Sequence, residues 1–320
     1  MPDCLEIAGS ASELRSRLPL LRELNDLKRL YSANLSANSL ATQIFRGACR
    51  PLSTGAALEP LPWASTAVAA ARLGAITPES LLAAGVPKEK RAAIYRRSLA
   101  AHAGLSQDLI EDLTGCVDNV TERLEGEFAY AEDEWPQRLC RAPRAGATCP
   151  GKPRIVLEPA ELHSDHCAMV AVYGFMLADI FGANRDDAWL IGLCHHFHNA
   201  YLPDSGFTGE MLLGDQLNQI IGSFRDQALR EIHPNYRNRI SSLFSEIAGD
   251  ASPLAQTFHA ADTIDRVVQM ENYERAAQFR VGHALHDLEL VHESPTQAFQ
   301  KNLLKSIGLL PGVESVPCGE

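Results

Sequence analysis

His163-Ser-Asp-His166 is the first of three short runs that concentrate histidine and aspartate in the second half of the chain. The other two are Leu193-Cys-His195-His196-Phe-His198-Asn199 and His259-Ala-Ala-Asp262-Thr-Ile-Asp265. Each run lies in or beside an apolar pattern with the period of an α-helix. A histidine in a buried helix needs a partner, because an unpaired polar group away from water costs a few kcal/mol. Three such runs predict helices that share one partner, and a metal ion is the simplest candidate.

Helical spacing predicts how these side chains converge, because residues three apart lie on nearly the same face of a helix. The spacing holds for His163 and His166, for His195 and His198, and for His259, Asp262 and Asp265. Helical proteins build metal sites from such stripes on facing helices. Imidazole with carboxylate suits Mn, Fe, Zn or Ni better than Ca, and Mg also stays open, so the pattern predicts a divalent ion of undetermined identity.

The bulk properties of the 320-residue chain exclude some classes of function. A hydrophobic content of 46% suffices for a sizeable core. The net charge of −11 argues against a nucleic-acid binder, which needs a basic footprint. The chain contains neither a long apolar run nor the pattern of a secretory signal, so we expect a cytoplasmic protein that does not enter a membrane. The eight cysteines form no Cys-x-x-Cys pair, and we expect reduced thiols.

Helical periodicity in both halves predicts an all-α fold. Residues 1–135 form a helical N-terminal region of unknown role. Its leucines recur every three or four positions from Leu14 to Leu30, and Pro19 inside this stripe predicts a helix that begins there. The stripe fits either a core or a homodimer interface, and the pattern favours the core. Residues 136–154, rich in Arg, Pro and Gly, are interpreted as a basic linker or loop, and residues 155–320 as the metal-binding domain.

Within that domain we expect a helix over residues 161–181 that stops at Gly182. Asp186 or Asp187 is expected to cap the next helix, which would extend to about Ala200. Further helices are expected over residues 216–232, 236–248, 254–280 and 295–307.

The three runs resemble the HD superfamily of metal-dependent phosphohydrolases. That family is marked by a His on one helix, an adjacent His-Asp pair on the next, and an Asp on a later helix. The corresponding segments here are His166-Cys-Ala-Met-Val-Ala-Val-Tyr, Leu190-Ile-Gly-Leu-Cys-His195-His196 and Ala261-Asp262-Thr-Ile-Asp265-Arg266. The resemblance covers roughly residues 155–290. It implies an HD-type helical domain in which His166, His195, His196 and Asp262 bind the metal.

The chain departs from the family at His196, where the family has the aspartate of its pair. A carboxylate in that place can bridge two metals, whereas a neutral imidazole binds only one. The departure implies a mononuclear site, an altered metal preference, or a degenerate domain that binds without catalysing. A core histidine with satisfied hydrogen bonds is the other interpretation of His196.

The loop after the pair offers a candidate acid. In the nucleotidase branch of the family an Asp in this region protonates the leaving group, and Asp204 lies at a suitable distance along the chain for that catalytic role. A turn after Pro203 explains Asp204 equally well, and for Glu210 we favour the turn. Asn199 stands where the family has an acidic residue that orients water, and an amide cannot act as a base.

The remaining candidates surround the expected ligands. We expect His163, His198, His259 and Asp265 to be either ligands or hydrogen-bond partners of ligands. Arg185 and Arg266 are the candidate cations for a substrate phosphate.

The resemblance implies a metal-dependent hydrolase that acts on a small phosphorylated molecule such as a nucleotide. An HD-type iron oxygenase or lyase is one alternative. A catalytically degenerate HD domain that serves as a ligand-binding or signalling module is another.

Overall fold

The computed structural model describes residues 8–31, 38–102, 104–124, 134–152, 154–156, 159–277, 280–287 and 289–310. All regular secondary structure in these ranges is helical, which confirms the expected all-α fold. Extended backbone in the described ranges pairs only in isolated bridges, Tyr31 with Ser39, Pro143 with Leu162 and Ala147 with Ile155. No helix of the described residues has the length and apolar character needed to cross a membrane.

The N-terminal region forms α1 (Ala8–Asn25), α2 (Leu40–Thr54), α3 (Leu61–Ala71), α4 (Pro78–Ala83), α5 (Lys88–Ala100) and α6 (Gln107–Leu124). The prediction that the first helix begins at Pro19 is wrong, because α1 continues through that proline. Leucines on both sides of Pro19 are buried, and their burial offsets the cost of a proline inside a helix. The leucine stripe is therefore part of the core and is not available as a dimer interface.

The second half forms α8 (His163–Phe181), α9 (Arg185–Cys194), α10 (Gly206–Leu213), α11 (Leu217–Glu231), α12 (Pro234–Glu246), α13 (Pro253–Ala277) and α14 (Gln297–Ile307). Helix α8 stops at Gly182, which has φ 73°, as the sequence predicts. The predicted cap of α9 is wrong: the side chain of Asn184 accepts the backbone N–H groups of Asp186 and Asp187. Helix α9 ends at Cys194, so His195 and His198 do not share a helical stripe.

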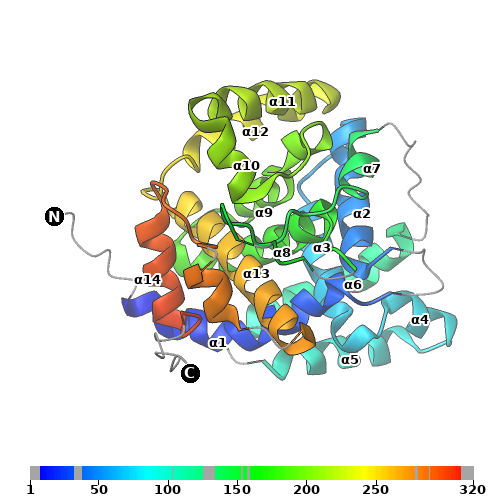
Figure 1. Ribbon diagram of the computed structural model, residues 1–320. Helices are drawn as coiled ribbons and strands as arrows, with labels where there is room; N and C mark the ends of the chain where they lie inside the picture. Colours follow the sequence, from blue (N-terminus) through cyan, green and yellow to red (C-terminus); the bar gives the residue numbers. More distant parts are fainter. Residues whose placement is uncertain are drawn as a thin grey trace.

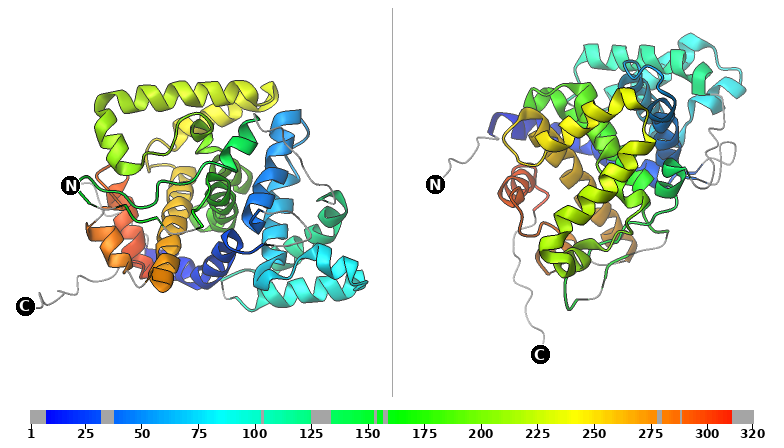
Figure 2. Two further views of the ribbon diagram at one scale, coloured as in Figure 1. Left: turned by 45° about the vertical axis from the view of Figure 1, so that its right-hand side comes forward. Right: turned by 90° about the horizontal axis from the view of Figure 1, so that it is seen from above.

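Helix α8 is the centre of the molecule and packs against α9, α13, α2 and α1. In Figure 1, α8 and α13 lie between the N-terminal helices α4–α6 on one side and α11 and α12 on the other. Figure 2 shows α1 running beneath α13 and α8, with α14 beside it. Buried residues from both halves of the chain form one continuous core, which includes Leu21, Phe45, Met169 and Val267.

The segment expected as a linker has a definite place in this core. It begins with α7 (Trp135–Leu139), whose Trp135 ring packs against Phe45 and Phe197. Extended backbone follows and runs beside the start of α8, where Arg144 N–H donates to Glu161 O at 2.7 Å. The six cysteines at described positions are free thiols, and Cys4 and Cys318 lie outside the described residues.

Candidate metal centre

Two helix ends and the middle of α13 meet at the candidate site. His163 and His166 lie in the first turn of α8, His195 follows the last residue of α9, and Asp262 lies on α13. The close crossing of α8 and α9 depends on Gly192. A Cβ atom there would lie 2.7 Å from Ala171 Cα, so a larger residue would force the helices apart. This close approach brings the end of α9 against the first turns of α8.

Three ligand-type atoms converge at this point. His166 Nε2 lies 3.1 Å from His195 Nε2 and 3.1 Å from Asp262 Oδ1. His195 Nε2 lies 3.8 Å from Asp262 Oδ1. Nitrogen and oxygen ligands bind first-row metals at about 2.1 Å, which separates neighbouring ligands by about 3.0 Å in an octahedron and about 3.4 Å in a tetrahedron. The observed separations are close to what a single ion requires.

The protonation states of the two rings follow from their outer hydrogen bonds. His166 Nδ1 lies 2.7 Å from Asp265 Oδ2, and His195 Nδ1 lies 2.7 Å from Gly192 O. Both partners are acceptors, so each Nδ1 carries the proton and donates. A neutral ring of this kind has a lone pair on Nε2. With both rings neutral, two Nε2 lone pairs and one carboxylate oxygen face one another, and a positive charge between them, either a metal ion or a proton on one Nε2, makes the arrangement favourable.

His196 belongs to the same cluster but is engaged differently. Nitrogens of His166, His195 and His196 lie within 4.8 Å of one another. His196 Nδ1 donates to Asn199 Oδ1 at 2.8 Å, and the Asn199 amide is oriented by its own donation to Leu202 O. The lone pair on His196 Nε2 accepts from Arg144 Nη1 at 2.5 Å. Burial, together with neighbouring imidazoles and Arg144, holds the pKa values of His195 and His196 well below the usual range.

Asp265, expected as a ligand or a partner of one, is a hydrogen-bond partner in this structure. Besides His166 Nδ1, its carboxylate accepts from Lys28 Nζ at 2.6 Å and from Asn25 Nδ2 at 3.0 Å. Lys28 Nζ also lies 2.6 Å from Glu161 Oε1. Glu161, His166 and Asp265 form a second group with metal-site spacing, but the Lys28 ammonium already bridges its two carboxylates. The N-terminal region, whose role the sequence left open, thus supports His166.

Charge balance keeps this support ionised. Burial acts to raise the pKa of Glu161, but Lys28 and Arg144 outweigh it and lower that pKa to about 2. Burial acts to lower the pKa of Lys28, and the carboxylates of Asp265 and Glu161 more than compensate for it. At the convergence point, burial acts to raise the pKa of Asp262, whereas the neighbouring His166 and Arg266 lower it overall. Asp262 is therefore a carboxylate at neutral pH, as a metal ligand must be.

The structure places three of the remaining candidates away from the convergence point. His259 Nε2 lies within hydrogen-bond distance of the carbonyls of Ile247 and Gly249, after the end of α12. Arg185 donates to Phe175 O and pairs with Asp179, so its assignment as a phosphate ligand is not supported. The His198 ring lies 5.7 Å from the His196 ring, and burial and Arg225 lower its pKa to about 3.

His163 lies between the loop after α7 and the turn that contains Asp204. Its Nδ1 donates to Ala142 O at 3.0 Å, so its lone pair is on Nε2. That atom is buried without a hydrogen-bond partner among the described residues and lies 3.6 Å from Asp204 Oδ2. Burial and the nearby Arg144 lower the pKa of His163 to about 4. His163 is thus a neutral neighbour of the cluster.

Asp204 is fixed as a turn residue. Its carboxylate accepts the backbone N–H groups of Ala145 and Gly206, each at 2.9 Å. Burial acts to raise the pKa of Asp204, but Arg144 and these donors lower it overall. A carboxylate stabilised in this way is a poor general acid, so the local structure favours the turn over the catalytic role.

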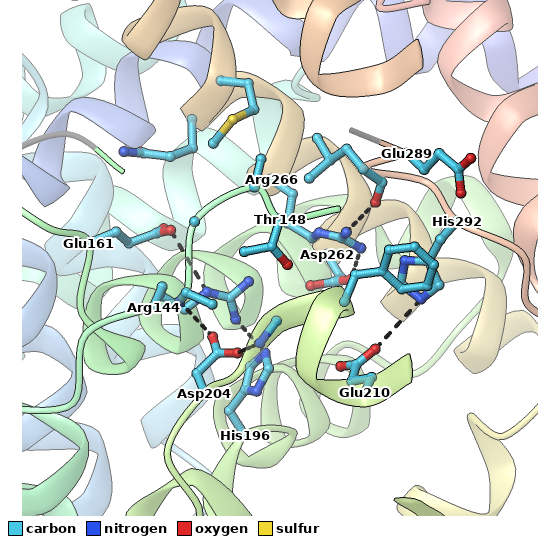
Figure 3. Close-up of a pocket in the computed structure, with 18 of the residues that line it drawn as sticks. Arg144, Thr148, Glu161, His196, Asp204, Glu210, Asp262, Arg266, Glu289 and His292 are labelled. Carbon is cyan, nitrogen blue, oxygen red and sulfur yellow. Dashed lines mark hydrogen bonds and ion pairs between the residues drawn. The ribbon is translucent and has the colours of Figure 1, made fainter. Parts of the chain in front are cut away.

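A pocket of about 240 Å³ opens beside the cluster, with His195, His196 and Asp262 in its wall. Figure 3 shows Arg144 and Arg266 on two sides of this pocket and Glu210 near its rim beside His292. Burial raises the pKa of Glu210, which the sequence had favoured as a turn residue. Periodicity gave no signal for Arg144, because it lies in the extended segment that we expected to be a linker.

Comparison with protein-family models, with curated proteins and with solved structures gave no match for this chain. The resemblance to the HD superfamily therefore rests on the residues quoted above.

Proposed function

We propose that the protein is a metal-dependent phosphohydrolase of the HD type, acting on a small phosphate ester such as a nucleotide. The observation that carries the proposal is the convergence of His166 Nε2, His195 Nε2 and Asp262 Oδ1 within 3.8 Å of one another. These three residues would hold one divalent ion. When bound, such an ion supplies Lewis acidity toward a phosphoryl oxygen and lowers the pKa of a water molecule.

The chain's own residues would supply the other requirements of phosphoryl transfer. Arg266 pairs with Asp262 at 3.7 Å and also donates to Leu290 O, which fixes its guanidinium at the pocket wall. A fixed guanidinium can bind phosphate oxygens and orient the ester. Glu210, whose pKa is raised by burial, takes the role of proton donor to the leaving group in this proposal, in place of Asp204. The pocket of about 240 Å³ suits a small substrate.

Metal analysis of protein purified without chelator is the first test. We expect one first-row metal ion per chain in the wild type and its loss in His195→Ala and Asp262→Asn. The matched control is His259→Gln. His259 is also a mostly buried histidine, and it lies on α13 like Asp262, but its replacement leaves the three converging atoms in place. Absence of metal from the wild type, or its retention by both site variants, would refute the proposal.

Phosphate release from a panel of nucleotides and p-nitrophenyl phosphate, with Mn, Fe, Zn, Ni and Mg supplied in turn, is the second test. Hydrolysis that disappears in Asp262→Asn and persists in His259→Gln supports the assignment. Metal binding without turnover of any ester would identify a degenerate, ligand-binding domain instead. Turnover that requires oxygen and Fe(II) and releases no phosphate would identify an oxygenase.

A further inference from the structure

Arg144 lies beside the candidate metal centre and is held in place by its surroundings. Its Nη1 donates to His196 Nε2 at 2.5 Å, and its Nε lies 3.8 Å from Glu161 Oε2. The side chain is only 14% exposed. Burial acts to lower the pKa of Arg144, but the carboxylates of Glu161, Asp204 and Asp262 raise it overall. A guanidinium does not lose its proton in proteins, so this position carries a permanent positive charge.

The contact with Arg144 determines what His196 can bind. An imidazole nitrogen has one lone pair in the plane of its ring, and His196 Nδ1 is protonated because it donates to Asn199 Oδ1. With Arg144 in its observed position, the remaining lone pair on Nε2 is not available to a metal ion. The imidazole at the position of the family's bridging carboxylate is therefore satisfied by a side-chain cation.

Arg144 also retains hydrogen-bonding capacity toward the pocket. A guanidinium has five N–H donors in a planar fork. His196 accepts from one of them, and Nε is directed toward Glu161. The residue lines the pocket that contains His195, Asp262 and Arg266 (Figure 3). Its donors that have no partner among the described residues are suited to an anion, because guanidinium and phosphate geometries match in a two-point contact.

We propose that Arg144 is the second cation of this centre: it occupies the lone pair of His196 in place of a second metal ion and binds a phosphate oxygen of the substrate beside the first ion. This inference rests on the proposed function for the identity of the substrate, but not for the anion site itself. It predicts a centre that takes one ion per chain and loses affinity for phosphate when the guanidinium is removed.

The test combines metal stoichiometry with calorimetric titration of inorganic phosphate, on metal-loaded and metal-free protein. Arg144→Gln should retain one ion per chain and weaken phosphate binding about 10- to 100-fold, as expected for loss of charge-assisted hydrogen bonds. Arg144→Lys keeps the charge without the planar fork and should weaken binding about 10-fold, so it tests the idea even if the Gln variant folds poorly. Arg154→Gln is the control, because Arg154 donates to Ala145 O in the same loop but does not line the pocket.

Two results would overturn the inference: phosphate affinity unchanged in both Arg144 variants, or two ions per chain in the wild type. Failure of the proposed function gives a different result. A wild type that binds phosphate through Arg144 but hydrolyses no ester would refute the hydrolase and support the anion site. Hydrolysis and phosphate affinity that both survive in Arg144→Gln would refute the role of Arg144 and leave the hydrolase intact.

Discussion

Replacing Lys28 with methionine should be among the most damaging single changes available in the N-terminal region. The Lys28 side chain is 2% exposed, and its ammonium lies 2.6 Å from carboxylate oxygens of both Glu161 and Asp265. Methionine has a similar shape but no charge, so the variant would retain two acidic groups in a site closed to water. Leaving one partner of a buried ion pair uncompensated costs about 3–5 kcal/mol, and we expect Lys28→Met to lose that much unfolding free energy at pH 7.

The loss should depend on pH in a defined direction. Without the ammonium, the folded-state pKa of Glu161 would rise above its unfolded value of about 4, because burial would no longer be offset by Lys28. A carboxyl group with a raised folded-state pKa lowers stability as pH rises above its unfolded pKa, because the unfolded chain then ionises more readily than the folded protein. The variant should therefore be closer in stability to the wild type at pH 5 than at pH 8. Urea denaturation at the two pH values measures the difference directly.

A double-mutant cycle makes the argument specific. Adding Glu161→Gln to Lys28→Met removes one unpaired carboxylate and should recover at least about 2 kcal/mol. Metal affinity provides an independent measurement, because Asp265 orients His166, and loss of such outer hydrogen bonds typically costs 10- to 100-fold. A loss below about 1 kcal/mol for Lys28→Met, or simple additivity with Glu161→Gln, would show that this ion pair does not support the site as argued.

Three further changes test other parts of the structure. Gly192→Ala should cost about 1–3 kcal/mol in urea denaturation and also weaken metal binding, because its Cβ would meet the backbone of Ala171; wild-type stability would contradict the close crossing. Glu210→Gln should lower kcat at least about 100-fold on alkyl phosphates but little on p-nitrophenyl phosphate, whose leaving group needs no proton; an equal effect on both would exclude a proton donor. In metal-free protein, His163 should contribute a loss of up to about 3 kcal/mol of stability as pH falls from about 6.5 to 4, because unfolded chains protonate it there and the folded state, with its pKa of about 4, does not. His195, His196 and His198 add to the same slope, so His163→Gln should make it shallower without removing it, and an unchanged slope would refute the assignment.

Local patterns predicted the helices well, because burial of one face repeats along the chain. The expected helix over residues 161–181 corresponds to His163–Phe181, and that over residues 216–232 corresponds to Leu217–Glu231. Errors occurred where one side chain or tertiary packing changes the outcome. Asn184 caps α9 two residues before the nearer expected aspartate, and the packing of α1 carries that helix through Pro19.

Spacing also predicted part of the site. His166 and Asp262 were expected on facing helices, and the structure brings them together at 3.1 Å. His259 shares a helical stripe with Asp262, but α13 is long enough for that stripe to serve two environments, and His259 lies near the carbonyls that follow α12. A helical pattern therefore identifies a face of a helix, whereas the ligand set depends on which helix end lies opposite each turn of that face.

The cations of the centre could not be predicted from spacing, for a physical reason. Lys28 is 237 residues from Asp265, and Arg144 is 52 residues from His196. Lys28 ends a three-residue 3-10 helix (Asp26–Lys28) that follows α1, and Arg144 lies in extended backbone with no hydrophobic period, so neither position carries a local signal. Each is recognisable only through the charge that it must neutralise. The buried carboxylates of Glu161 and Asp265 require an ammonium, and the lone pair of His196 requires a donor. Where a helical pattern buries a polar group that has no partner nearby in the sequence, a side chain of opposite charge or a hydrogen-bond donor should therefore be sought elsewhere in the chain.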